Sequence, residues 1–345
     1  MNRRSTWIGC VVVFSLVVSA IFAGCGGQQA GKAEKWPTRP ITLIVGFAPG
    51  GGMDVMCRAL APEMAKKLGV EVVVQNMPGA GSGTAADFVI KQAADGYTLF
   101  APSSAVATFP AMANSNVTYK EMGMLAIPII AEPTFLVHKN SPVKNMNDLI
   151  ALWKKGGSTG SNTGAGGLWH IPQVLSVNAV GGNVKYVPYP SGKDTAMAVA
   201  KGDVEWGTSG ALMEAGGLIV EGLIRPLAIF SDKPYQLVGY GEIPPITQFI
   251  PELKDKIVAG AGWRGLAYKK GIPKDRLDKI AEATKFAIES ESFQQMVKKN
   301  GLIAGNYYGA EADKAYEQTT RIQSWLLHDL KISRRSPETM GVLRP

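Results

Sequence analysis

Residues 41–52 read ITLIVGFAPGGG, an apolar run that ends in a loop with one proline and three successive glycines. Residues 53–68 then place apolar side chains at helical spacing, so a strand, a glycine loop and a helix follow one another. The same order recurs in residues 71–93, with a second loop, PGAGSG, at residues 78–83, and residues 97–101 give a third strand. This alternation predicts an α/β fold with a mostly parallel sheet flanked by helices.

The rest of the chain contains too many strands for one small sheet. With 345 residues, a division into two α/β lobes is the natural expectation. Further strands are expected at residues 134–138, 185–187, 204–206, 226–230 and 265–268, and helices at residues 276–297 and 310–330.

The N-terminal segment predicts export and lipid attachment. Arg3 and Arg4 precede an apolar run, residues 8–23, that closes on small residues before Cys25. Phe-Ala-Gly-Cys resembles a bacterial lipobox, with Phe22 where leucine is usual. We expect a signal peptide over residues 1–24, a lipidated Cys25 and a flexible tether over residues 25–35. An uncleaved membrane anchor is the alternative, although the run is short for a bilayer that needs about 20 apolar residues.

Cysteine content and charge limit the classes of function. After processing and lipidation of Cys25, Cys57 carries the one remaining thiol, so no intramolecular disulfide forms, and we expect Cys57 to be a small buried residue on a helix. The formal net charge of +8 falls by two with the signal peptide. A mild positive charge suits an anionic ligand. The basic residues are scattered apart from Lys331, Arg334 and Arg335, so the sequence does not indicate nucleic-acid binding.

The two glycine loops are the expected functional site. Ligands of open α/β sheets bind beyond the carboxyl ends of strands, where helix N-termini offer unpaired N–H groups and partial positive charge to an anion. Glycine lets the ligand approach the backbone. Asp54 is interpreted as a helix-start residue, since a carboxylate would repel an anion.

Enzyme signatures are absent from these loops. Residues 79–84 lack the third glycine of a dinucleotide fingerprint, and no Gly-Lys-Ser/Thr follows any glycine loop. His138, His170 and His328 stand far apart in the sequence without ligand-like neighbours, and no Gly-x-Ser-x-Gly elbow occurs. The sequence therefore nominates no catalytic residue, no metal site and no cofactor, and leaves open a catalytic triad assembled from distant residues.

Several segments in order resemble the tripartite tricarboxylate transporter solute-receptor family, also called the Bug family. The resemblance covers nearly all of the mature chain. Its strongest parts are residues 36–41, 47–54 with Arg58, 76–81 and 95–99, and further segments are residues 163–166 with His170, 187–189, 202–204, 225–228, 263–267 and 336–338.

The resemblance implies a periplasmic-binding-protein type II fold with the ligand in an interlobe cleft. Lobe 1 is expected to comprise residues 36–130 plus 255–345, and lobe 2 residues 131–254. In this family backbone amides and ordered waters of the first two glycine loops hold the ligand's carboxylate. The implied ligand-binding residues are Phe47, Ala48, Pro49, Gly50, Gly51, Gly52, Pro78, Gly79, Ala80, Gly81, Ser103, Ser104, Thr163, Gly164, His170, Ser191, Gly192 and Ser209.

Several further positions bear on the ligand. Many relatives place an aspartate that selects an amino group at the position of Thr208 and Ser209, so its absence here disfavours amino acids. Trp169, Trp206 and Trp263 either line the cleft, favouring an apolar or aromatic carboxylate, or belong to the core. Arg264 either clamps a carboxylate or forms an ion pair.

The expected function is an extracytoplasmic receptor, anchored by lipid to a membrane in the periplasm or at the cell surface. A monomer would close its lobes around one small carboxylate (a di- or tricarboxylate or an aromatic acid) and deliver it unchanged to membrane-embedded transporter subunits. A sensor-type binding protein and a hydrolase of carboxylic esters are the alternatives.

Overall fold

The computed structural model describes residues 35–131, 133–210, 214–257, 262–300 and 302–345. Residues Pro37–Pro345 form one compact unit. The predicted signal peptide, Cys25 and all of the predicted tether except Lys35 lie outside the described residues. None of the helices in the described ranges is both long and apolar enough to cross a bilayer.

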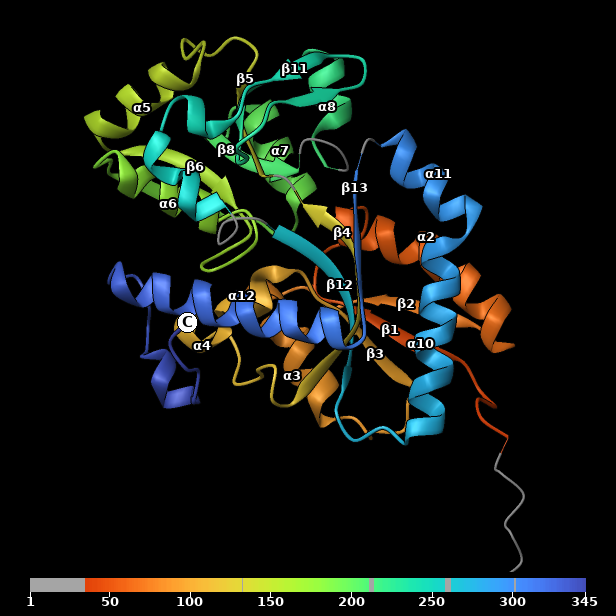
Figure 1. Ribbon diagram of the computed structural model, residues 1–345. Helices are drawn as coiled ribbons and strands as arrows, with labels where there is room; N and C mark the ends of the chain where they lie inside the picture. The colour runs from red at the N-terminus through yellow and green to blue at the C-terminus, as the bar shows by residue number, and fades with distance from the viewer. Residues whose placement is uncertain (1–34, 132, 211–213, 258–261, 301) are drawn as a thin grey trace, which may run out of the picture. The chain divides into compact units, whose positions relative to one another are not determined.

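Two large sheets are the centres of the two lobes (Figure 1), and a smaller two-stranded sheet accompanies them in the described chain. Lobe 1 holds a six-stranded sheet of order β13-β4-β12-β3-β1-β2. Strand β1 pairs in parallel with β2 and β3, as the sequence predicts, whereas β12, β4 and β13 are joined by antiparallel pairing. The strands are β1 Ile41–Val45, β2 Val72–Asn76, β3 Thr98–Ala101, β4 Met122–Ala131, β12 Gly262–Lys269 and β13 Ile303–Tyr308.

The prediction of a mostly parallel sheet is therefore wrong for half of lobe 1. Strand β4 carries the chain out of this sheet toward lobe 2, and β12 brings it back, so the two run in opposite directions. Their pairing ends at Gly262 and Ala131, next to the crossing between lobes.

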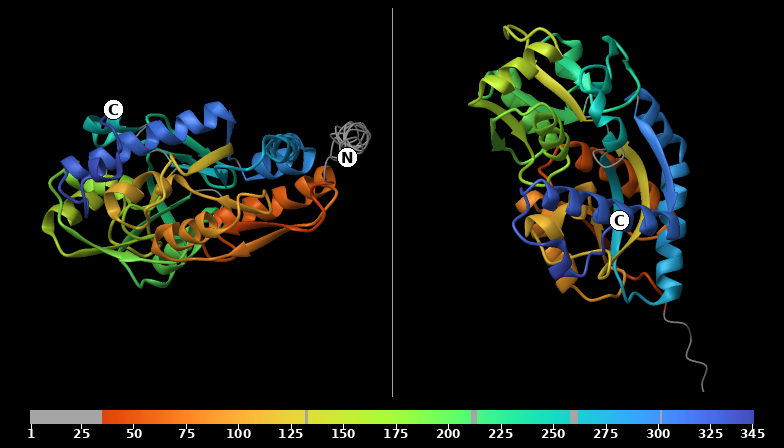
Figure 2. Two further views of the ribbon diagram at one scale, coloured as in Figure 1. Left: turned by 90° about the horizontal axis from the view of Figure 1, so that it is seen from below. Right: turned by 60° about the vertical axis from the view of Figure 1, so that its left-hand side comes forward.

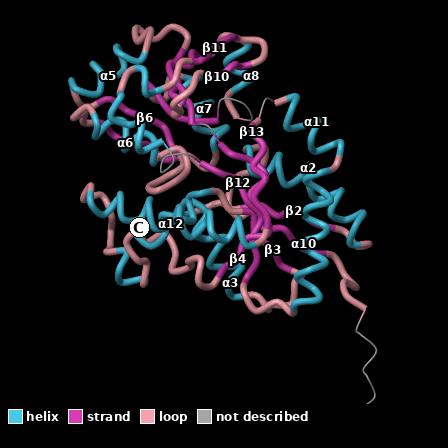
Figure 3. The backbone as a smooth tube through the Cα atoms, viewed as in Figure 1, coloured by secondary structure: helices cyan, strands magenta, loops and turns pink. Residues whose placement is uncertain are grey.

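Helices cover both faces of the lobe 1 sheet. Figure 3 shows α2 and α10 on one side of the strands and α3 and α12 on the other. Successive residues of a strand point to opposite faces of the sheet. Ile44 points to the face that α3 and α12 cover, where it packs with Ala86 of α3 and Tyr316 of α12. The helices are α2 Gly52–Leu68, α3 Gly83–Lys91, α4 Phe109–Met112, α10 Lys274–Glu289, α11 Glu291–Lys299 and α12 Ala310–Asp329.

The C-terminal region is less uniformly helical than its sequence predicts. Ser290 ends α10 and caps α11, where its hydroxyl accepts a hydrogen bond from the N–H of Phe293 at 3.3 Å. Strand β13 then separates α11 from α12.

Lobe 2 holds a five-stranded sheet of order β7-β6-β8-β5-β9. Strand β6 pairs in parallel with β7 and β8, while β5 pairs antiparallel with β8 and β9, so this sheet is also mixed. The strands are β5 Pro133–His138, β6 Ser158–Asn162, β7 Val184–Pro188, β8 Trp206–Gly210 and β9 Ile224–Ile229.

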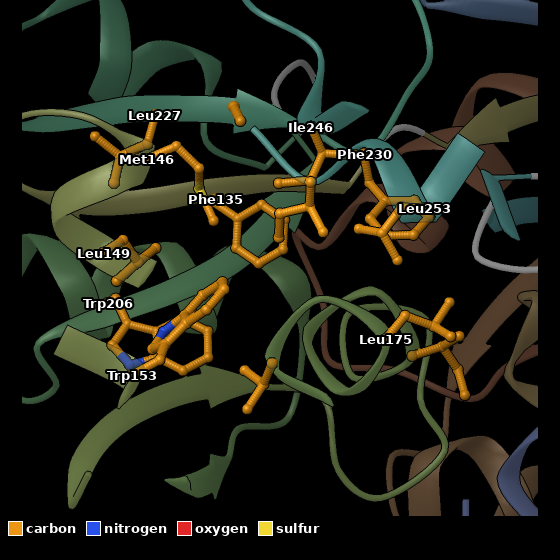
Figure 4. Packing of buried hydrophobic residues seen from close by; sticks show 14 of the residues in the cluster. Phe135, Met146, Leu149, Trp153, Leu175, Trp206, Leu227, Phe230, Ile246 and Leu253 are labelled. Carbon is orange, nitrogen blue, oxygen red and sulfur yellow. The ribbon is translucent and has the colours of Figure 1, made fainter. Parts of the chain in front are cut away.

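Two apolar layers enclose the lobe 2 sheet. On one face Phe135 packs against Trp153 with ring centroids 5.6 Å apart, and Trp153 packs against Trp206 at 5.1 Å (Figure 4). On the other face Leu136 packs with residues of α7 and α8. The helices are α5 Met146–Lys155, α6 Ile171–Ala179, α7 Gly192–Lys201 and α8 Gly216–Val220.

Short elements complete the fold. They are the antiparallel hairpin of β10 Tyr235–Leu237 and β11 Gly241–Ile243, and the 3₁₀ helices η1 Ala80–Ser82, η2 Ser104–Thr108, η3 Ile246–Gln248, η4 Pro251–Lys256 and η5 Pro337–Met340. Figure 2 shows the red and orange N-terminal elements together with the blue C-terminal helices in lobe 1, and the green and cyan elements in lobe 2. Leu327 of α12 joins the apolar cluster of lobe 2.

Candidate functional site

The first glycine loop is held by the buried carboxylate of Asp54, in the first turn of α2. Asp54 accepts hydrogen bonds from the N–H of Gly50 at 2.8 Å, from Nε of Arg58 at 2.9 Å and from Nδ2 of Asn76 at 3.0 Å. Asn76, the last residue of β2, also donates to the carbonyl of Phe47 at 2.9 Å. Burial alone would raise the pKa of Asp54, but these hydrogen bonds outweigh it and hold that pKa below its usual value. Asp54 is thus the helix-start residue that the sequence predicts.

The second glycine loop is strained. Gly79, Ala80, Gly81 and Ser82 have φ of 141°, 47°, 60° and 82°, four successive residues in conformations that favour glycine. Two of the four are not glycine. Strain of this kind persists only where the surrounding structure enforces it, and it concentrates at functional sites.

A large cavity at the loops has a volume of about 390 Å³ and is walled by both lobes. Lobe 1 contributes the residues that follow β1, the strained loop, Asn114 and Arg334, and lobe 2 contributes the loop after β6 and the end of β7 with the loop that follows it. The lining residues are Gly46, Phe47, Gly79, Ala80, Gly81, Ser82, Asn114, Thr163, Gly164, Ala165, Pro188, Tyr189, Pro190 and Arg334.

Two hydroxyl groups in the wall of this cavity have unused hydrogen-bonding capacity. Ser82 of lobe 1 and Thr163 of lobe 2 are 0% and 5% exposed. Neither Oγ of Ser82 nor Oγ1 of Thr163 has a partner among the described residues. A buried polar atom without a partner costs about 1–3 kcal/mol, so each such group requires an explanation.

A second, tight space of about 10 Å³ lies beside the first, and Phe47 and Thr163 line both. An ion pair between the lobes lines it. Nη2 of Arg264, on β12, donates to Oε1 of Glu214, which follows β8, at 2.6 Å. The two side chains are 2% and 3% exposed.

The N-termini of two helices meet at this ion pair. A Cβ on Gly52, the first residue of α2, would lie 2.4 Å from Oε1 of Glu214, and a Cβ on Gly192, the first residue of α7, would lie 2.9 Å from it. Only glycine allows this approach. The carboxylate of Glu214 therefore occupies the environment that helix N-termini provide for an anion.

Hydrogen bonds across the cleft join the lobes next to the large cavity. Oγ1 of Thr108, on η2, donates to the carbonyl of Gly166 at 2.6 Å, and Nδ2 of Asn114 donates to the carbonyl of Ala165 at 2.8 Å. The loop after β6 is thus attached to lobe 1 at two points.

The predicted ligand-binding residues divide into three groups. Those lining the large cavity are Phe47, Gly79, Ala80, Gly81, Thr163 and Gly164. Those lining the small space are Phe47, Gly51, Gly52, Ser103, Thr163, Ser191 and Gly192. Those lining neither space are Ala48, Pro49, Gly50, Pro78, Ser104, His170 and Ser209.

Two residues of the last group support the site from behind. Nδ1 of His170 accepts a hydrogen bond from the N–H of Gly166 at 2.9 Å, and its ring packs edge-on against Tyr186. Burial lowers the pKa of His170 to about 4, so the ring is neutral at neutral pH. Oγ of Ser209 donates to the carbonyl of Gly192 at 2.7 Å and so positions the start of α7.

The structure resolves the alternatives at four positions. Trp206 belongs to the apolar cluster of lobe 2, where its Nε1 donates to Oγ of Ser158 at 3.3 Å. Arg264 forms an interlobe ion pair, and Trp169 lines the small space with the Arg264 guanidinium 5.7 Å from its ring centroid. Trp263 belongs to the apolar cluster of lobe 1 and its Nε1 donates to Oγ1 of Thr319 at 3.3 Å.

Sequence reasoning missed several residues of the site. Glu214 and Asn114 carry no motif, and only the fold brings them to the cleft. Arg334 had a signal, because it stands in the one dense basic cluster of the mature sequence.

The model of the tripartite tricarboxylate transporter family receptor matches residues 56–323. The chain belongs to this receptor family. The predicted relationship to the Bug proteins is confirmed, since the receptor is 32% identical over 227 residues to BugT of Bordetella pertussis, covering 63% of this chain and 68% of BugT. Proteins of this family are extracytoplasmic binding proteins, not a class of enzymes.

Solved structures share the fold of the receptor. MatC of Rhodopseudomonas palustris, determined with bound malate, is 22% identical, with a TM-score of 0.74 over 86% of this chain and 99% of MatC. Rpa4515 of R. palustris, determined with adipate, is 21% identical, with a TM-score of 0.72 over 90% of this chain and 100% of Rpa4515. The predicted two-lobed periplasmic-binding-protein fold is confirmed.

Proposed function

We propose that this receptor captures one small carboxylate in the 390 Å³ cavity between its lobes and delivers it, unchanged, to the membrane-embedded subunits of a tripartite tricarboxylate-type transporter. The observation that carries the proposal is the pair of buried hydroxyls, Ser82 and Thr163, which lie in opposite walls of that cavity without partners among the described residues. Ligand oxygens that accept hydrogen bonds from these hydroxyls would satisfy a buried polar group of each lobe.

The shape of the site suits a carboxylate. Gly79 and Gly81 carry no side chains, so an anion can approach the backbone of the strained loop at these two positions. The cavity volume falls within the usual range for small-molecule sites, about 300–1,000 Å³. The malate and adipate bound to MatC and Rpa4515 are carboxylates of a size suited to such a space.

Binding is expected to favour the closed arrangement of the lobes. Thr108 and Asn114 hold the loop after β6 against lobe 1, and this loop also carries Thr163 and Gly164. A ligand that contacts both walls binds the closed arrangement more tightly than an open one, and so shifts the population toward it.

Chemical conversion of the ligand is not part of the proposal. Cys57 is buried on α2, and burial raises its pKa, so it is a poor nucleophile. His170, neutral at neutral pH, is bound to Gly166 and lines neither space. We propose further that the receptor acts as a monomer and is held at a membrane by lipid on Cys25, after removal of residues 1–24.

A ligand screen tests the function. Purified protein is mixed with dicarboxylates, tricarboxylates and aromatic acids while thermal unfolding is monitored, because a ligand of the folded state at 100 times its Kd adds about 2.7 kcal/mol to stability. We expect one class to raise Tm and to be recovered unchanged by NMR. Catalytic turnover of any of these acids, or of their esters, would favour a hydrolase instead.

Two genetic experiments test the cellular role. Deletion of the gene is expected to abolish uptake of the tightest ligand, whereas unchanged uptake would argue for a sensor. Replacing Cys25→Ala is expected to release the protein from the membrane fraction and to remove an acyl modification detectable by mass spectrometry.

A further inference from the structure

The C-terminal segment after α12 folds back onto the mouth of the large cavity. The N–H of Arg334 donates to the carbonyl of Ala111 at 2.8 Å, which places this residue beside α4 of lobe 1. Further along, Nε1 of Trp325 donates to the carbonyl of Val342 at 3.0 Å and Arg344 forms an ion pair with Asp329 at 2.8 Å. The segment is therefore attached to α12 at its far end as well.

The neighbouring residue, Arg335, is the anchor of this segment. Its guanidinium donates to the carbonyls of Pro110 at 2.7 Å, Phe109 at 3.1 Å and Ser115 at 2.7 Å, and to Oδ1 of Asn116 at 2.8 Å. These bonds tie Arg335 to α4 and to the residues that follow α4 in lobe 1. Arg334 is exposed and is one of the residues that line the cavity, and its guanidinium forms no hydrogen bond or ion pair with the described residues.

Charge in the cavity comes from one residue. The lining contains glycines, prolines, small residues, Asn114 and two aromatic residues, and Arg334 is its one charged member within the described chain. Among the described residues, no carboxylate lines the wall to neutralise it. An arginine fork binds a carboxylate through two parallel charge-assisted hydrogen bonds, which lysine and neutral side chains cannot provide.

We propose that Arg334 clamps a second carboxylate of the ligand, so that the receptor selects dicarboxylates over monocarboxylates of equal chain length. The inference rests on the proposed function: one carboxylate binds at the strained loop of residues 79–82, and the other pairs with Arg334. Selectivity for the second charge then lies in the C-terminal segment, outside the glycine loops.

Calorimetric titration with matched acids tests this role. Adipate is compared with hexanoate, and succinate with butyrate, for the wild-type protein and for Arg334→Gln. We expect Arg334→Gln to weaken the better dicarboxylate by about 10- to 100-fold, as for loss of a charge-assisted hydrogen bond, and to leave the monocarboxylate within about twofold. Arg334→Lys should lie between the two, because it keeps the charge and loses the fork.

Lys331→Gln is the matched control, since it removes the same charge from the same segment without touching the cavity. It should leave both affinities unchanged. Wild-type protein that binds dicarboxylates and monocarboxylates equally, or an Arg334→Gln variant that keeps its dicarboxylate affinity, would overturn the inference and leave the receptor function intact. Failure of every carboxylate to bind wild-type protein would overturn both.

Discussion

Arg264 and Glu214 form a buried ion pair that joins the two lobes, with Nη2 and Oε1 2.6 Å apart. Arg264 belongs to the strand that leads back into lobe 1, and Glu214 follows the central strand of lobe 2. Opening the cleft would expose both charges to water, whereas closing it requires their desolvation. The closed packing of the lobes therefore depends on both charges of the pair being present.

Glu214→Gln should be strongly destabilising. The substitution leaves the Arg264 guanidinium buried without a counter-charge, and breaking a buried pair in this way costs about 3–5 kcal/mol. Urea unfolding of the purified protein measures the loss. The double variant Glu214→Gln with Arg264→Met removes both charges and should recover much of it, and a single variant as stable as wild type would contradict the burial of the pair.

Thr163→Val should separate ligand binding from stability. The replacement keeps the side-chain volume and removes a hydroxyl that has no partner among the described residues, so stability should stay equal or rise by up to about 1 kcal/mol. Affinity for the carboxylate should fall about tenfold if the hydroxyl serves the ligand.

Thr195→Val is the matched comparison for that experiment. Oγ1 of Thr195 donates to the carbonyl of Gly192 at 2.6 Å and approaches the carbonyl of Thr208 at 3.0 Å, so its loss should lower stability by about 1–3 kcal/mol. If Thr163→Val were the more destabilising of the two, its hydroxyl would have a structural role.

His170 should make stability depend on pH. Its pKa falls from 6.5 in the unfolded chain to about 4 in the fold, so the unfolded state binds more protons between these values. The contribution of neutral His170 to the free energy of unfolding is therefore fully present above about pH 6.5. It is lost as the pH falls toward 4, by roughly 3 kcal/mol in all. Urea midpoints at pH 7.5 and 5 measure this difference. In His170→Gln, whose amide oxygen can accept the Gly166 N–H, the difference should shrink, and an unchanged difference would assign it to other groups.

Gly52→Ala should disturb the meeting point of the lobes. The new Cβ would approach Oε1 of Glu214 to 2.4 Å and Nη2 of Arg264 to 2.7 Å, and overpacking of this kind costs about 1–3 kcal/mol. Carboxylate affinity should fall with it, because closure brings these atoms together. Gly217→Ala, on α8 with no atom within 4 Å of the added carbon, should leave both properties unchanged.

The sequence predicted the local units of the fold well, because their signals are local. Strand, glycine loop and helix at residues 41–68 are encoded by an apolar run, by glycines and by helical spacing, and all three occur as predicted. The long strand β4 was missed because it is buried almost throughout, so no alternation marks it. Strand β6, with the sequence STGSN, looks like a loop and becomes a strand only through its neighbours in the sheet.

The site divides in the same way. Backbone positions of the loops could be predicted, since glycine patterns identify them before any tertiary structure is known. Glu214, Asn114 and Arg334 reach the cleft through the packing of distant elements, and the spacing of residues along the chain carries no information on that packing. The mixed character of both sheets has the same origin, because strand direction depends on where the chain crosses between lobes.

The pairing of β4 with β12 limits how the lobes can move. The two strands are paired up to Gly262 and Ala131, so these two ends of the ribbon cannot shift independently of each other. Such a ribbon bends easily across its face and resists shear within its plane. Lobe motion should therefore have close to one degree of freedom, which reduces the conformational search that precedes capture of the ligand.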